Sequence, residues 1–101
     1  MTERYNGWTN YETWCAALWM DQEGDHWRER AEEAVREYVD YDEARYQLSE
    51  EMSSFYDEFM PTVSGMYADL LGAAMSSINW SEISKHYLDD VEIADIDEIE
   101  E

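Results

Sequence analysis

The chain has 101 residues with 26 acidic and 6 basic side chains, which gives a formal net charge of −20 and a pI near 4.1. This length predicts one domain, and the charge excludes nucleic acid and anionic membrane as partners because both would repel the chain. Cys15 is the single cysteine, which excludes an internal disulfide and favours a reducing, cytoplasmic location. Neither a signal peptide nor a long apolar run is recognisable.

The charge of the chain is comparable to that of duplex DNA. B-form DNA carries one negative charge per about 1.7 Å of axis, so a charge of this size corresponds to roughly 34 Å of duplex. A folded domain of this length has a radius of gyration of about 13 Å, and its diameter is therefore of the same order. A strongly basic protein surface, above all one built to hold nucleic acid, is the expected partner. Adaptation to high salt is the alternative explanation for the acidity.

The first predicted helix spans residues 10–22. Thr9 and Glu12 have the spacing of a capping box, and Gly24 follows as the stop signal. Large apolar side chains recur at i, i+3, i+4, i+7 and i+8, and we expect this stripe to face the core and anchor it. The stripe consists of Tyr11, Trp14, Cys15, Leu18 and Trp19. Within it, the thiol of Cys15 is expected to be a buried structural group.

A second helix is predicted to begin after Asp25 and to run to about Val39, and a third runs from about residue 41 to 60, where Pro61 ends it. The two helices are either joined tightly near Asp40 or form one long bent helix, and the pattern favours neither. Each has an apolar stripe that we expect in the core. The stripe of the second helix is Trp27, Ala31, Ala34, Val35 and Tyr38, and that of the third is Tyr41, Leu48, Met52, Phe55 and Phe59.

A fourth helix is expected to begin near Thr62 or Ser64. This stretch has Asp69 as its lone acid, so we expect it to be the most central element. Its broad apolar face is made of Met66, Tyr67, Leu70, Leu71, Ala74 and Ile78. A fifth helix follows an Asn79 cap, with Glu82 three residues later. Its inner edge is Trp80, Ile83, Tyr87 and Leu88.

The predicted fold class is therefore all-α. Residues 1–90 form a single compact helical domain of four or five helices, and residues 91–101 form an acidic C-terminal tail. The tail contains regularly spaced apolar residues that could dock on the domain or on a partner. They are Val91, Ile93, Ile96 and Ile99.

No motif predicts catalysis, a metal site or a cofactor. The Asp40-Tyr41-Asp42 stretch begins like a calcium loop but lacks the glycine and the terminal glutamate that such a loop needs. His26 and His86 have no partner at metal-ligand spacing. No nucleophile with a matching base and no phosphate-binding glycine loop is recognisable. We expect a protein that is not an enzyme and that binds neither metal nor cofactor.

The candidate partner-binding residues are acids on the outer faces of the second and third helices and at the start of the tail. From Asp21 to Glu58 the chain has fourteen acids against four bases, an excess that solubility alone does not require. The candidates are Glu29, Glu32, Glu33, Glu37, Asp40, Asp42, Glu43, Glu50, Glu51, Asp57, Glu58, Asp89 and Asp90.

Two segments resemble a family of small phage- and plasmid-encoded proteins. They are Asn10-Tyr11-Glu12-Thr13-Trp14, followed by Leu18-Trp19, and Asn79-Trp80-Ser81-Glu82-Ile83. The resemblance implies an origin on a mobile element rather than an activity. By charge and size, the chain is also similar to DNA-mimicking antirestriction and anti-CRISPR proteins.

That second resemblance implies a DNA-mimic inhibitor in the bacterial cytoplasm. It would block the basic DNA-binding surface of a restriction enzyme or a CRISPR effector. The alternative is a mobile-element adaptor or regulator that binds a host protein through aromatic or apolar surface. Binding of the first kind weakens with salt, whereas binding of the second kind survives it.

Overall fold

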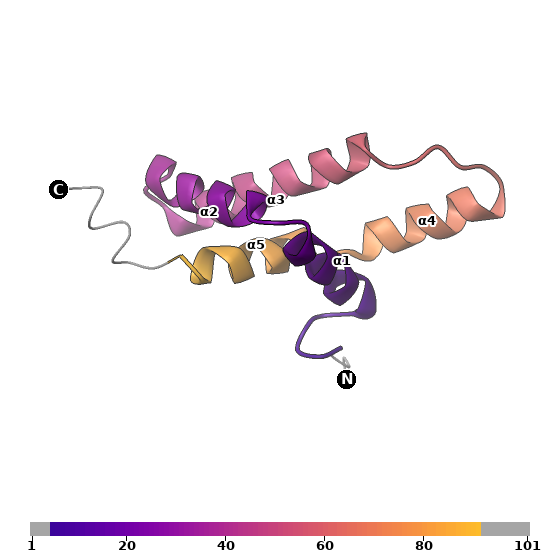
Figure 1. Ribbon diagram of the computed structural model, residues 1–101, viewed down its shortest axis with the longest axis horizontal. Coiled ribbons are helices and arrows are strands. Elements are labelled where there is room, and N and C mark those ends of the chain that lie inside the picture. The colour runs from indigo at the N-terminus through magenta and orange to yellow at the C-terminus, as the bar shows by residue number, and fades with distance from the viewer. Residues whose placement is uncertain (1–4, 92–101) are drawn as a thin grey trace.

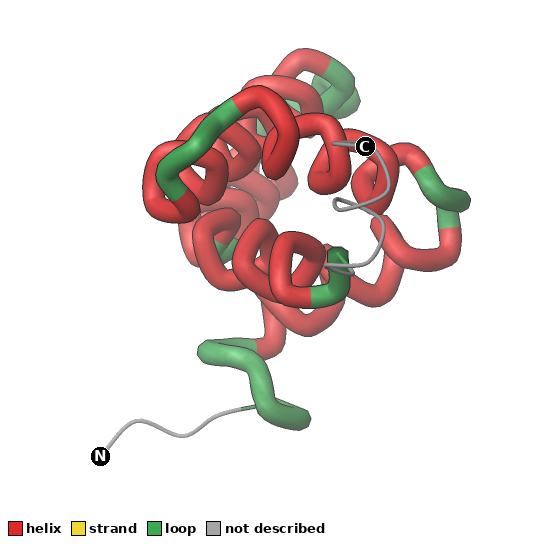
Figure 2. The backbone as a smooth tube through the Cα atoms, turned by 90° about the vertical axis from the view of Figure 1, so that its left-hand side faces the viewer, coloured by secondary structure: helices red, strands yellow, loops and turns green. Residues whose placement is uncertain are grey.

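A computed structural model gives the fold and describes residues 5–91. The helices are α1 (Tyr11–Gln22), α2 (His26–Glu37), α3 (Tyr41–Glu58), α4 (Met66–Ser77) and α5 (Trp80–Asp89) (Figure 1). Within residues 5–91, turns and loops join the helices and no extended strand is present (Figure 2). The prediction of an all-α single domain is confirmed, with five helices.

The core lies where α2, α3 and α5 meet. The antiparallel pair α2 and α3 packs against α5, and Leu48, Met52 and Ile83 are fully buried between these helices. Trp27 of α2 is also buried, and its indole N–H donates a hydrogen bond of 3.0 Å to the hydroxyl of Tyr56. The apolar stripe predicted for the second helix is therefore confirmed at its centre. The stripe of the third helix is buried at Leu48 and Met52, whereas its two ends are exposed at Tyr41, Phe55 and Phe59.

The junction between α2 and α3 is a break between two helices. Tyr38 is in an extended conformation (φ −111°, ψ 121°), which ends α2. The carboxylate of Asp40 then caps α3 by accepting a hydrogen bond of 3.2 Å from the backbone N–H of Asp42. Because a new cap starts a new helix, the alternative of one long bent helix is excluded.

The first helix differs from the sequence prediction in both its cap and its buried face. Asn10, rather than Thr9, is the N-cap, and its side chain accepts a hydrogen bond of 2.9 Å from the N–H of Thr13. The buried side chains of α1 are Thr13, Ala17 and Met20. The predicted stripe lies elsewhere on the helix: Tyr11, Leu18 and Trp19 are 50%, 40% and 60% exposed, and Trp14 and Cys15 are half-buried. The expectation that this aromatic stripe anchors the core is wrong, because Thr13, Ala17 and Met20 are the buried side chains of α1 instead.

The two segments that carried the family resemblance are in contact with each other. The hydroxyl of Thr13 accepts a hydrogen bond of 2.9 Å from the N–H of Asn79 and donates one of 2.6 Å to Asn10. The amide of Asn10 donates to the carbonyl of Ser77 at 2.8 Å. Nearby, the N–H of Thr9 donates to the carboxylate of Glu82 at 3.0 Å. These bonds fasten the start of α1 to the turn between α4 and α5.

The fourth helix is the least buried of the five, so the prediction that it is the most central element is wrong. No residue of α4 is buried, and its main contact with another helix is with α1. Figure 1 shows α4 extending to the end of the molecule opposite the α2–α3 turn. The radius of gyration of 15.2 Å exceeds the value of about 13 Å typical of a domain of this length. The other helices form the compact body, and α4 projects from it.

Of the other predicted helix ends, the Asn79 cap and the Gly24 stop are confirmed. In contrast, α4 begins at Met66 after Gly65 rather than near Thr62 or Ser64, and α3 ends at Glu58 before Pro61 is reached. Asn79 caps α5, since its side chain accepts from the N–H of Glu82 at 3.1 Å. Gly24 follows α1 with a φ of +120°, a conformation that favours glycine. Val91 packs against the core, while the other apolar tail residues lie outside the described residues. Within residues 5–91, no helix combines the length and the apolar character needed to span a membrane.

Candidate functional site

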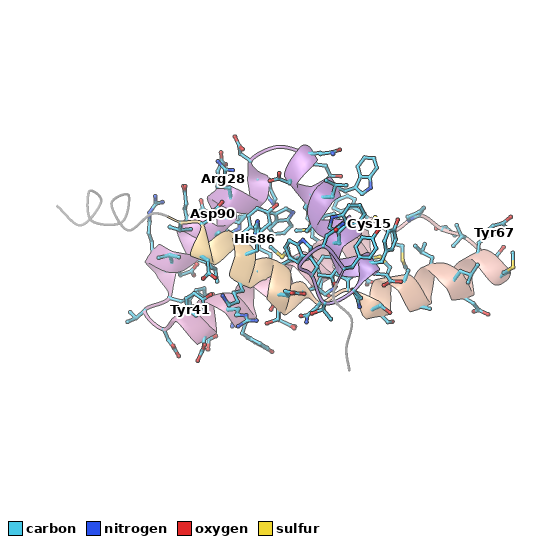
Figure 3. The ribbon with its side chains drawn as sticks, turned by 90° about the horizontal axis from the view of Figure 1, so that it is seen from below. Cys15, Arg28, Tyr41, Tyr67, His86 and Asp90 are labelled. Atoms are coloured by element: carbon cyan, nitrogen blue, oxygen red, sulfur yellow. The ribbon has the colours of Figure 1, made fainter. Side chains whose placement is uncertain are left out.

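The acids proposed from the sequence lie on α2, on α3, on the turn between them and at the end of α5. Glu32 and Glu51 are half-buried, and the other candidates are exposed. On α2 and α3 they occupy positions away from the buried stripes. The hydroxyl of Tyr41 donates a hydrogen bond of 2.8 Å to Asp89, which joins the end of α5 to the start of α3. Figure 3 shows Tyr41 and Asp90 at the same end of the molecule. We call these thirteen acids the acidic face.

Along α3 the acids recur in pairs. The pairs are Asp42 and Glu43, Glu50 and Glu51, and Asp57 and Glu58. They follow each other at seven or eight residues, which is close to two helical turns, so they return to the same side of the helix about every 11 Å. The helix α3 thus carries acids near its start, its middle and its end.

The charge density of this region can be compared with that of DNA. The stretch from Asp21 to Glu58 has fourteen acids and four bases, an excess of ten negative charges. Its longest helix, α3, has 18 residues and is therefore about 27 Å long. Duplex DNA of that length carries about 16 charges. Three of these fourteen acids, Asp21, Glu23 and Asp25, precede α2, so residues 26–58 have eleven acids, four bases and an excess of seven. The helical pair α2–α3 thus has somewhat less than half the linear charge density of a duplex.

Among the described residues, three acids of the acidic face are already in ion pairs within the protein: Glu33 and Glu51 with Arg30, and Asp89 with Lys85. The guanidinium of Arg30 on α2 donates hydrogen bonds of 2.7 and 2.8 Å to the carboxylate of Glu51 on α3, and it also contacts Glu33. The hydrogen bonds to Glu51 raise the pKa of Arg30 above its usual value. The spacing of Arg30 and Glu33 was a readable signal of a helical ion pair. The contact with Glu51 depends on the packing of α2 against α3 and had no such signal.

Other acids of the set also have structural roles. Asp40 caps α3, and Glu43 accepts a hydrogen bond of 2.7 Å from the amide of Gln47. Hydrogen bonds from Lys85 and from Tyr41 lower the pKa of Asp89, so its charge is stabilised in the fold. Among residues 5–91, the carboxylates of Glu50, Asp57 and Glu58 have neither a hydrogen bond nor an ion pair within the protein. The same holds for the exposed carboxylates of Glu29, Glu37, Asp42 and Asp90, so these seven acids are the best placed to meet a partner.

The thiol of Cys15 is half-buried rather than enclosed in the core. It lies in the wall of a groove, next to α4, and not beside a histidine. In the part of the chain from Tyr5 to Val91, no three His, Cys, Asp or Glu side chains are placed to hold a metal ion together.

A second surface was missed by the reasoning from sequence. A groove of about 360 Å³ lies between α1, the residues that follow α3, and α4. Its walls include Cys15, Trp19, Phe59, Leu71, Met75 and Trp80. Beyond the groove, Met66, Tyr67 and Leu70 are each more than 60% exposed. Figure 3 shows Tyr67 at the far end of α4, away from Tyr41 and Asp90. We call the groove and these neighbouring side chains the apolar face.

The comparisons with known proteins give a family without an assigned activity. A family model described as a family of unknown function, DUF7249, matches residues 1–101, and the chain belongs to this family. No curated protein and no solved structure matches the chain.

Proposed function

We propose that this member of the DUF7249 family is a DNA-mimic inhibitor encoded by a mobile element. It blocks the basic DNA-binding surface of a bacterial defence nuclease or CRISPR effector in the host cytoplasm. The observation that carries the proposal is the acidic face: exposed carboxylates follow α2 and α3 over about 27 Å, the length of α3. In this role the carboxylates stand where DNA phosphates would be.

Electrostatics supports a basic protein as the partner. Lys and Arg side chains that hold DNA phosphates also form charge-assisted hydrogen bonds with carboxylates. The charge of the chain speeds its encounter with such a surface and repels nucleic acid. The exposed acids of α3 meet the partner, and the Arg30–Glu51 pair keeps α2 and α3 in register beneath them.

The experiment begins with capture of the target from the natural host, followed by competition with duplex DNA. A variant without three unpaired carboxylates, Glu50→Gln/Asp57→Asn/Glu58→Gln, should bind the target about tenfold more weakly. Each lost pair at a partly exposed interface contributes about 0.5 kcal/mol, and about 1.4 kcal/mol is tenfold in affinity. The matched control, Asp21→Asn/Asp25→Asn/Asp69→Asn, makes the same change of charge away from the candidate acids and should bind like the wild type.

Two results would contradict the proposal. In the first, duplex DNA and this protein occupy the target at the same time. In the second, the two triple variants weaken binding equally, so that total charge rather than the acidic face matters. Salt shortens the Debye length from about 10 Å at 0.1 M to about 3 Å at 1 M, so ionic contacts should weaken over this range. Binding that is unchanged between 0.1 and 1 M salt would therefore favour the alternative, an adaptor held by apolar contacts.

A further inference from the structure

The apolar face is too large and too exposed to be explained by the fold of one chain. Trp19, Phe59, Met66, Tyr67 and Leu70 are all at least 60% exposed. The aromatic side chains among them alone expose roughly 400 Å², since burial of one removes about 150–250 Å². With the methionine and the leucine, the exposed area approaches the roughly 800 Å² per partner that a stable protein interface buries. A monomer rarely exposes an apolar patch of more than about 600 Å².

The helix at the centre of this face is poorly supported within the monomer. A helix of 12 residues is marginal without packing, since isolated helices shorter than about 12–15 residues are barely stable in water. Gly72 lies in its interior and costs about 1 kcal/mol relative to alanine. α4 has no buried side chain, and its main contact with another helix is with α1. A further surface packed against α4 would supply the missing support.

The distribution of charge limits what that surface can be. Residues 59–81 include one charged side chain, Asp69, and the lining of the groove adds Glu12 and Glu23, whereas the rest of the chain is strongly acidic. A basic partner would be held better by the acidic face, and an acidic partner gains no ionic contact here. The occupant must therefore present an apolar surface of its own.

A second copy of this chain meets these requirements. Any other face would bring like charges together at close range, which costs free energy. The apolar face runs from α1, near the middle of the molecule, along α4 to one end of the longest axis, 55 Å in extent, and the α2–α3 turn lies at the other end (Figure 1). Two copies joined there keep their most acidic ends farther apart than the Debye length of about 10 Å at 0.1 M salt.

The shape of the face also suits a twofold dimer. It carries a groove between α1 and α4, and α4 also has three exposed side chains outside the lining of the groove, Met66, Tyr67 and Leu70, which we call the ridge. In a symmetric pair, the same patch serves both partners, so the ridge of each copy can fill the groove of the other. We propose that the chain is a homodimer joined through the apolar face.

Sedimentation equilibrium of the full chain in 0.5 M NaCl tests the proposal. The wild type should have a mass of about twice the 12.0 kDa of one chain at micromolar concentration. Leu70→Glu puts a charge among the exposed apolar side chains of α4, at a site that is 61% exposed in the monomer, so it should give a folded monomer. Val39→Glu is the matched control, because Val39 is a fully exposed apolar residue on the α2–α3 turn, and it should remain a dimer.

Hydrogen exchange gives an independent readout. In the wild type, the amides of α4 should exchange at least tenfold more slowly at 100 µM than at 1 µM, and in Leu70→Glu this difference should vanish. A wild type that sediments as a monomer at 100 µM would overturn the proposal, as would a dimer that Val39→Glu disrupts and Leu70→Glu does not. Capture of a host protein in a complex that Leu70→Glu abolishes, with a monomeric wild type, would assign the face to that other protein instead.

Discussion

The hydroxyl of Thr13 is the point at which the start of α1 is joined to the turn before α5, and its removal should destabilise the fold. Thr13 is completely buried, and its hydroxyl accepts from the N–H of Asn79 and donates to Asn10. The change Thr13→Val keeps the shape of the side chain and removes both hydrogen bonds. It leaves the N–H of Asn79 without its partner.

The cost can be worked out from these two bonds. A hydrogen bond contributes about 0.5–1.5 kcal/mol net, so Thr13→Val should lower the free energy of unfolding by about 2 kcal/mol. For a domain of this size, 1 kcal/mol corresponds to about 4–8 °C, so Tm should fall by about 8–16 °C. The comparison variant Thr13→Ser keeps the hydroxyl and loses one methyl group, which costs about 1 kcal/mol.

Urea unfolding followed by circular dichroism measures both changes. A double-mutant cycle with Asn10→Ala should show a coupling of at least about 0.5 kcal/mol, since both variants remove the same hydrogen bond. The reasoning is refuted if Thr13→Val is more stable than Thr13→Ser, because packing of the methyl group would then matter more than the hydrogen bonds. Strict additivity in the cycle would refute it as well.

Three further changes test other parts of the structure. Arg30→Met should destabilise the protein by about 0.5–1 kcal/mol at low salt and by less in 0.5 M NaCl, because the pair with Glu51 is partly exposed; equal losses at both salt concentrations in urea unfolding would contradict an ionic role. Met20→Ala should cost at least about 2 kcal/mol, and Leu18→Ala less than about 1 kcal/mol, since Met20 is 3% and Leu18 40% exposed; the reverse order would restore the stripe predicted from sequence. Burial raises the pKa of Tyr41 and of Tyr87 to about 12, against about 10 in an unfolded chain. The folded state therefore retains protons that the unfolded state loses, so stability is intact below about pH 10 and falls as the pH rises towards 12; urea unfolding across this range should show a smaller fall when both tyrosines are changed to phenylalanine.

Sequence patterns predicted the helices well and the buried faces less well. In α2, one face is apolar and the other is charged, so the stripe through Trp27 and Ala31 could be read directly. In α1, apolar residues lie all round the helix. Large aromatic side chains favoured one face, but the structure buries Thr13 and Ala17, whose small size allows α1 to approach α5. The hydroxyl of Thr13 is buried without penalty because it is hydrogen-bonded, and that partner is 66 residues away in the chain.

The acids of the candidate site were found from composition, and their exposure on α2 and α3 agrees with the periodicity of those helices. The pairing of Glu51 with Arg30 could not be predicted, because it depends on which turns of α2 and α3 lie side by side. The apolar side chains of α4 were wrongly predicted to be in the core for a related reason. A broad apolar stripe predicts burial against something, and the pattern of α4 does not distinguish the core of its own chain from the surface of another molecule.

The hydrogen bonds that join the start of α1 to the turn before α5 have a consequence for truncated chains. α5 supplies Ile83, Tyr87 and Leu88 to the core, and its first turn holds the cap region of α1 through contacts that span most of the chain. Contacts of such high sequence separation slow folding. The core and these hydrogen bonds both require α5 and the turn before it, so a chain truncated before residue 80 should form helices without a closed core.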